Sequence, residues 1–360
     1  MTTTFVSNPL EEQDVYAFPV SFAQQRLWFL DQLHPQSAAY NLFSTVRISV
    51  PLNIDALEQS LHMLIQRHEV MRTIFVMRDG QPMQMIVPHV KVPLQVVDLE
   101  HLPETQREAE VLGLANAEVQ RPFDLARGPL LRTMLFRLRA EEYLLLLTIH
   151  HIIFDGWSMN VFLRELSTLY QAVANGQPAA LPELPIQYAD FAVWQRERLQ
   201  DEVLEEQLAY WKKHLTGART TLELPSDRPR PAGSALPGSM HLFRFSKSLT
   251  YSLKALSRQE GVSLFTTLVA AFQTLLYRYT GQDDLLLGTD TADRSQAGTE
   301  DLIGFFVNTL VLRSDLSGNP TFRELLGRAR QEILGAYGHQ DVPIEYLVKE
   351  LQPDRSLGQN

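Results

Sequence analysis

One short segment near the middle of the chain constrains its fold and chemistry more than any other. The apolar run 143–147 has the composition of a buried strand, and residues 161–170 have the apolar spacing of a helix. Between them lies the sequence HHIIFDGWS, from His150 to Ser158. A strand, a turn and a helix would therefore bring two imidazoles, a carboxylate and a glycine together at one strand end. This set of groups suits acyl transfer without a nucleophile from the protein.

Each side chain in this turn has an expected task. Neutral His151 can accept a proton near pH 7. His150 should point to the opposite face of the strand and pack or hydrogen-bond beneath the site. A carboxylate is too weak a base to suit an ammonium group, so we expect Asp155 to hold an ion pair that fixes the turn. Gly156 is expected to be needed for the turn, and its N–H could face a tetrahedral oxyanion. Trp157 and Ser158 are expected to pack against and cap the helix that follows.

Composition narrows the possible classes of protein. The 360 residues, 45% of them hydrophobic, are enough for two lobes. The chain has no cysteine, which excludes thiol nucleophiles, disulfides and cysteine-ligated metals and fits a cytoplasmic location. A formal net charge of −10 without a basic cluster argues against nucleic acid. No apolar run is long enough to span a membrane, and no set of residues has the spacing of a metal site.

The chain alternates strands and helices, which predicts an α/β fold. We expect a loosely ordered N-terminus at 1–14, a first lobe at 15–180, an interlobe connection at 181–237 and a second lobe at 238–360. The connection contains a proline- and glycine-rich stretch at 216–237 that cannot hold a regular element. Ser21 is the expected N-cap of the first helix, and Phe265, Leu268 and Phe272 are expected core residues. The expected helices are 21–30, 55–67, 161–170, 249–260 and 263–279, and the expected strands are 45–50, 73–77, 82–87, 143–147, 241–245, 284–288 and 307–312.

Six ordered motifs carry a resemblance to a known family. They are SFAQQRLW at 21–28, RHEVMRT at 67–73, HHIIFDGWS at 150–158, YADFAVW at 188–194, IGFFVNT at 303–309 and HQDVPIE at 339–345. With these motifs the chain resembles a condensation domain of nonribosomal peptide synthetases, within the superfamily similar to chloramphenicol acetyltransferase. The resemblance implies two acetyltransferase-like lobes in a V-shaped arrangement. Because the chain ends inside what resembles the last family motif, we expect the second lobe to be incomplete.

The resemblance also implies a reaction and its partners. A donor acyl or peptidyl thioester would be joined to the α-amine of an acceptor aminoacyl thioester. Both would be carried on phosphopantetheine arms of peptidyl carrier proteins, beside adenylation and other synthetase domains. The arms belong to the partners, so the chain itself would bind no cofactor and no metal.

For the site, the resemblance implies specific roles. His151 would position or deprotonate the attacking amine, and positioning should matter more, because a free α-amine is already largely neutral near physiological pH. The partner of Asp155 would be Arg294, from the second lobe. Two further arginines, Arg67 and Arg72, would either support the turn or form salt bridges with Glu69.

The remaining motif residues have expected structural roles. Asn308 would hydrogen-bond loop backbone, and His339 and Asp341 would order a nearby turn. Tyr188 and Trp194 are expected to pack between the lobes.

Two other classes of function stay open at this point. One is a related acyltransferase or an epimerisation domain, and the other is a non-catalytic domain that only recruits carrier proteins. Heterocyclisation is disfavoured, because relatives with that activity carry aspartates where this chain has His150 and His151.

Overall fold

The computed structural model describes residues 16–225, 227 and 241–351. The contacts of the described chain divide it into two compact units. The first unit contains residues up to 198 together with 292–307, and the second contains 199–291 and the residues from 308 onward. Among the described residues, the helices are all too short or too polar to cross a membrane.

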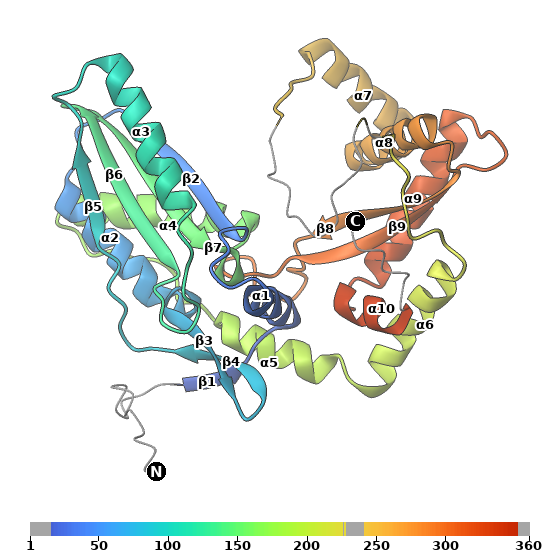
Figure 1. Ribbon diagram of the computed structural model, residues 1–360, viewed down its shortest axis with the longest axis horizontal. Coiled ribbons are helices and arrows are strands. Elements are labelled where there is room, and N and C mark those ends of the chain that lie inside the picture. Colours follow the sequence, from blue (N-terminus) through green and yellow to red (C-terminus); the bar gives the residue numbers. More distant parts are fainter. Residues whose placement is uncertain (1–15, 226, 228–240, 352–360) are drawn as a thin grey trace. The chain divides into compact units, whose positions relative to one another are not determined.

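A four-stranded sheet forms the centre of the first unit (Figure 1). Its strand order is β2-β7-β6-β5, with β5 and β6 parallel and the other pairs antiparallel. The strands are β5 (Leu94–Asp98), β6 (Leu131–Arg139), β7 (Glu142–His150) and β2 (Asn41–Ile48). Register is continuous to the last residue of β7, where His150 pairs with Asn41. The sheet therefore delivers the two histidines at the end of an inner strand.

Helices cover both faces of this sheet. Helices α2 (Ile54–Arg67) and α4 (Gly156–Ala174) pack on one face through apolar residues of β6 and β7 such as Leu135 and Leu147. Helix α3 (Glu104–Val119) lies on the opposite face, over Met134, Phe136 and Leu146 (Figure 1). Burial on both faces explains why β7 is an almost unbroken apolar run.

A second, three-stranded sheet lies in the same unit, with order β1-β4-β3. Its strands are β1 (Tyr16–Pro19), β3 (Thr73–Arg78) and β4 (Gln81–Ile86). The β3–β4 turn has positive φ at Asp79 (51°) and Gly80 (75°), the geometry of the tight hairpin that the Asp-Gly pair predicts. The remaining elements of the unit are α1 (Phe22–Leu33), α5 (Tyr188–Arg198) and the short 3-10 helices η1 (Glu69–Arg72) and η2 (His151–Ile153).

The second unit is built on an antiparallel strand pair, β8 (Asp284–Thr291) and β9 (Asn308–Asp315). Its helices are α6 (Asp201–Leu215), α7 (Lys247–Gln259), α8 (Leu264–Thr280), α9 (Phe322–Gly338) and α10 (Ile344–Leu351). Its core is divided into two apolar clusters, one around Trp211 and the other around Leu326.

Several sequence expectations differ from this structure. Residues 241–245 form no strand, because no described strand pairs with them. The region expected as an interlobe connection contains α5 and α6, whereas its described residues 218–225 have no regular structure. Phe265, Leu268 and Phe272 are 39%, 37% and 46% exposed, so their assignment to the core is wrong. The N-terminus at 1–14 and most of the proline-rich stretch lie outside the described residues.

The boundaries of the two contact-defined units also differ from the expected boundaries of the two lobes. Residues 292–307 pack into the first unit, although the sequence assigns them to the second lobe. The cause is apolar burial: Leu302, Ile303, Phe305 and Phe306 belong to the same core cluster as β7 and α4. The site described below is built on this inserted segment.

Candidate active site

The predicted turn connects β7 to α4. After His150 the chain makes one turn of 3-10 helix, η2, and the α-helix starts at Gly156. Asp155 is the N-cap of α4, and its Oδ1 accepts a hydrogen bond from the Ser158 N–H at 2.8 Å. The cap is thus Asp155, whereas the sequence pattern indicates Ser158. Capping at this position fixes where the helix begins relative to the strand.

The imidazole of His151 is held in one tautomer. Its Nδ1 lies 2.7 Å from the carbonyl oxygen of Phe154, and since a carbonyl can only accept, Nδ1 carries the hydrogen. In the neutral ring Nε2 then has a lone pair. Among the described residues Nε2 has no hydrogen-bond partner, and the side chain is only partly buried. His151 therefore presents an unpaired proton acceptor in a defined tautomer.

His150 occupies a different environment. Its side chain is 3% exposed and lies near the rings of Tyr40 and Phe123. Its Nδ1 accepts a hydrogen bond from the Ile152 N–H at 3.1 Å. Burial, with a smaller contribution from neighbouring His151, lowers the pKa of His150 from 6.5 to about 3. His150 is thus a neutral packing residue beneath the turn, and it does not share the accessibility of His151.

Asp155 and Arg294 form a buried ion pair, as the resemblance implies. Nη2 of Arg294 lies 3.1 Å from Oδ1 and 3.2 Å from Oδ2 of Asp155, and the two side chains are 3% and 0% exposed. Arg294 also donates to the carbonyls of Thr299 and Leu302 at 2.5 and 2.7 Å. Burial lowers the pKa of Arg294, and the charge of Asp155 acts in the opposite direction. Asp155 is fully engaged and is not available as a base.

The inserted segment, residues 292–307, also binds directly to the HHIIFDGWS turn. The Gly304 N–H donates to Ser158 Oγ at 3.0 Å, and the Phe306 N–H donates to Asp155 Oδ2 at 3.2 Å. The Trp157 indole N–H donates to the Glu300 carbonyl at 2.9 Å. Three residues of the motif therefore bind the same backbone segment.

Tyr188 holds this segment from another side. Its hydroxyl donates to the Phe305 carbonyl at 2.5 Å and lies 2.8 Å from Ser21 Oγ, at the N-cap of α1. Burial raises the pKa of Tyr188, which keeps the hydroxyl protonated. A Cβ at Gly304 would collide with the Tyr188 ring, so only glycine allows this close approach.

The turn does not need glycine at position 156, contrary to the expectation from the sequence. The φ of Gly156 lies outside the left-handed region, and a Cβ built on it would meet no atom within 4 Å. The turn itself consequently does not require glycine, and that expectation is wrong. What glycine leaves is open space at the first residue of α4, where backbone N–H groups lack intrahelical partners.

Of the two candidate supporting arginines, Arg67 is the last residue of α2 and Arg72 is the last residue of η1. Arg72 donates to Glu69 at 3.1 Å and to the Val87 carbonyl at 2.7 Å, which makes it part of a local salt bridge. Arg67 instead donates to Glu165, at 3.1 Å. The same Oε2 of buried Glu165 lies 2.8 Å from His68 Nε2. Arg67 thereby connects the end of α2 to the helix that starts at Gly156.

Asn308 belongs to the second unit. Its side-chain amide donates to the carbonyls of Gln340 and Val342 at 2.7 and 2.9 Å, which ties the start of β9 to the HQDVPIE motif. Within that motif the His339 ring stacks on Tyr210, with centroids 3.7 Å apart and planes within 2°. These contacts order a turn of the second unit.

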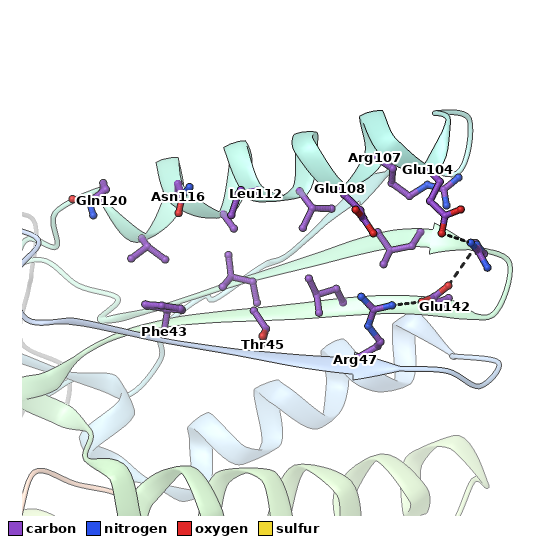
Figure 2. A pocket seen from close by; sticks show the side chains of 17 residues that line it. Phe43, Thr45, Arg47, Glu104, Arg107, Glu108, Leu112, Asn116, Gln120 and Glu142 are labelled. Carbon is purple, nitrogen blue, oxygen red and sulfur yellow. Dashed lines mark hydrogen bonds and ion pairs between the residues drawn. The ribbon is translucent and has the colours of Figure 1, made fainter. Parts of the chain in front are cut away.

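A groove of about 690 Å³ lies elsewhere on the first unit, between α3 and the sheet. Figure 2 shows Phe43, Thr45 and Arg47 of β2 facing Leu112 and the rest of α3 across it. At the charged end of the groove, Glu142 forms ion pairs with both Arg47 and Arg139. The groove is lined by none of the residues of the HHIIFDGWS turn.

Three comparisons with known proteins agree in their result. The family model described as "Condensation domain" matches residues 12–360. One of the linear gramicidin synthase polypeptides of Brevibacillus parabrevis is 55% identical over 339 residues, which are 94% of this chain and 4% of that protein. The chain thus spans a small fraction of the length of such relatives.

Two solved structures have the same fold. The X-domain in its complex with OxyB from teicoplanin biosynthesis matches with a TM-score of 0.82 and 29% identity, over 98% of this chain and 76% of that one. The first condensation domain of the calcium-dependent antibiotic synthetase matches with a TM-score of 0.82 and 23% identity, over 93% and 78%. The mixed α/β units, the ordered motifs and the family match agree, and the chain belongs to the condensation-domain family of nonribosomal peptide synthetases.

Proposed function

We propose that this chain catalyses amide-bond formation between two carrier-bound thioesters. The donor is an acyl or peptidyl thioester, and the nucleophile is the α-amine of an acceptor aminoacyl thioester. Both substrates would arrive on phosphopantetheine arms of carrier proteins from the neighbouring parts of a synthetase. The observation that carries the proposal is the unpaired Nε2 of His151, in the turn that leads into α4.

The chemistry proposed for His151 follows from its tautomer. The amine nitrogen attacks the thioester carbonyl, a C–N bond forms, and the nitrogen becomes positively charged. Nε2 of His151 can take the proton from that nitrogen, while the hydrogen on Nδ1 stays bound to the Phe154 carbonyl. The C–S bond then breaks, and the proton passes to the departing thiolate of the donor arm. No covalent intermediate on the protein is needed.

Positioning is the larger part of the proposed role. An α-amino group has an ordinary pKa of roughly 8, so much of it is already neutral at physiological pH. Holding amine and carbonyl in the attack geometry can contribute about 7–11 kcal/mol at best. A fixed imidazole that accepts a hydrogen bond from the amine provides one such constraint.

The N-terminus of α4 is proposed to stabilise the negative charge that develops on the carbonyl oxygen. Helix N-termini have a partial positive charge and free N–H groups. Gly156 is the first residue of α4 and is exposed. Its N–H is the group we assign to the oxyanion.

Asp155 and Arg294 support the site without touching substrate. Their ion pair, the cap on α4 and the bond to Phe306 fix the turn that carries His151. We assign Arg67 a supporting role as well, through Glu165 of α4.

The second candidate function is partner recruitment without chemistry. It is favoured by the likeness to an X-domain whose structure was solved in complex with OxyB. A recruitment surface has no need for an unpaired imidazole acceptor, so His151 favours catalysis. Epimerisation, in which a base removes the hydrogen of a carrier-bound α-carbon, would use the same acceptor.

One experiment separates these functions. The 360-residue chain is incubated with a panel of L- and D-aminoacyl donor carriers and one aminoacyl acceptor carrier, and products are measured by intact mass and chiral chromatography. A dipeptidyl acceptor carrier that forms faster than without protein supports the proposal. An inverted donor without a new bond indicates epimerisation, and carrier binding without product indicates recruitment; either result overturns the proposal.

A further inference from the structure

The His151 imidazole lies against an aromatic ring from the inserted segment. The centroids of the His151 and Phe305 rings are 4.6 Å apart, with the planes tilted by 58°. Phe305 is 2% exposed and belongs to the main core cluster of the first unit. A side chain so deeply packed has little freedom to move away from the imidazole.

The backbone around Phe305 is fixed by hydrogen bonds at three successive residues. Gly304 donates to Ser158 Oγ at 3.0 Å, Phe305 accepts from the Tyr188 hydroxyl at 2.5 Å, and Phe306 donates to Asp155 Oδ2 at 3.2 Å. The partners are buried. Phe305 is therefore held more firmly than its ring contact alone would require.

We infer that Phe305 is a positioning residue for the His151 imidazole. The inference rests on the proposed function, in which Nε2 must face the attacking amine. A single hydrogen bond at Nδ1 still allows the ring to rock about its Cβ–Cγ bond. The Phe305 ring removes that freedom from one side. A misplacement of about 1 Å in a reacting group can cost roughly 100-fold in rate, so this restraint has a measurable consequence.

Phe305 differs from neighbouring Phe306 in what its ring contacts. Phe306 is equally buried, but its ring faces Tyr188, Phe191 and the Arg294 guanidinium. Among the described residues, Phe305 alone places an aromatic ring against His151. The sequence carries no signal for this contact, because Phe305 and Phe306 are alike within one motif.

The kinetic test compares two identical substitutions. Phe305→Leu removes the flat ring beside His151, and Phe136→Leu makes the same change at a fully buried position under α3. Both should lower the urea midpoint. We expect Phe305→Leu to reduce kcat for dipeptide formation by about tenfold to 100-fold with KM for both carriers unchanged. Phe136→Leu should keep the wild-type kcat. Equal kcat in the two variants would overturn the inference.

A spectroscopic test does not depend on catalysis. In protein labelled with ¹⁵N-histidine, the His151 signals can be assigned among the 10 histidines by their loss in His151→Gln. The wild type should show the Nδ1–H tautomer and ring-proton signals that carry the ring-current shift of Phe305. In Phe305→Leu the shift should vanish and the Nε2–H tautomer should become detectable, whereas Phe136→Leu should match the wild type.

The two tests separate the inference from the proposed function. If the wild type forms no dipeptide but the His151 tautomer depends on Phe305, the proposed reaction is wrong and the positioning role stands. If dipeptide forms but Phe305→Leu changes neither kcat nor the His151 spectrum, the proposed reaction stands and the positioning role is wrong.

Discussion

Arg294 binds both carboxylate oxygens of Asp155 across a separation of 139 residues in the sequence. Neither side chain is appreciably exposed to solvent, so the pair is desolvated. It joins the inserted segment to the cap of the helix that follows the histidines. Through this ion pair, the structure of the HHIIFDGWS turn depends on a segment that is distant in the sequence.

The first prediction concerns this pair. Arg294→Met leaves the Asp155 charge buried without its partner, and breaking such a pair typically costs about 3–5 kcal/mol. Asp155→Asn should also destabilise, but the double variant should lose less than the sum of the two. The free energies of unfolding in urea give the coupling, expected at about 0.5–3 kcal/mol. Strict additivity would contradict the pairing.

A charge swap at these positions should not restore stability. Arg294 also donates to the carbonyls of Thr299 and Leu302, which an aspartate cannot do. Asp155 accepts from two backbone N–H groups, which an arginine cannot do. The swapped protein is therefore expected to be less stable than either single variant.

The second prediction concerns Gly156. Alanine at this position meets no atom within 4 Å, so Gly156→Ala should change the free energy of unfolding by less than about 1 kcal/mol. If substrate approaches the first residue of α4, the added methyl group should reduce the rate of dipeptide formation by about tenfold or more. Gly113→Ala, in α3 and equally uncrowded, is the matched control and should keep full activity. A fully active Gly156→Ala would place the substrate elsewhere.

The third prediction concerns the pH dependence of stability through His150. Its folded pKa is about 3 and its ordinary value is 6.5, so the unfolded chain binds a proton between these values and the folded chain does not. The contribution of His150 to the free energy of unfolding should be fully present above pH 6.5 and should decrease as the pH falls toward 3. From about pH 6.5 to about pH 5 this group should account for a loss of about 1–2 kcal/mol.

His150→Asn tests this assignment, because asparagine keeps an acceptor for the Ile152 N–H but does not titrate. Urea unfolding at about pH 6.5 and about pH 5 should give a smaller pH-dependent loss in the variant than in the wild type. Equal losses in the two proteins would show that the pKa of His150 does not differ between the folded and unfolded states.

The fourth prediction concerns Gly304. An alanine Cβ would overlap the Tyr188 ring, so Gly304→Ala must displace the ring or the backbone of the inserted segment. Overpacking of this kind costs about 1–3 kcal/mol. Gly327→Ala, in α9 with open space at Cβ, should leave stability unchanged or slightly raised. Comparable thermal midpoints for the two variants would argue against the close contact.

The sequence predicted the strand, turn and helix around the two histidines, because this local structure depends on neighbours in the chain. The apolar run of β7 and the helical spacing of α4 are local signals, whereas the cap at Asp155 was not predicted. The pairing of Asp155 with Arg294 was available only through the resemblance, since nothing local relates the two residues. The contact between His151 and Phe305 arises from tertiary packing and was missed altogether.

Helix α8 illustrates a different limit. Its apolar residues occur on more than one face, so spacing alone could not determine which face is buried. The structure buries the side with Thr266, Thr267 and Gln273 and leaves Phe265 and Phe272 partly exposed. The expected strand at 241–245 failed similarly, because a strand needs a pairing partner that local sequence does not specify.

The most direct test of the proposed catalysis is a single-turnover measurement with saturating donor and acceptor carriers, comparing the wild type with His151→Ala. A free imidazole acceptor that orients and deprotonates the amine should contribute about 10²- to 10⁴-fold. We predict that His151→Ala lowers the rate of dipeptide formation by at least about 100-fold while carrier binding is retained. Equal single-turnover rates for the two proteins would contradict the account.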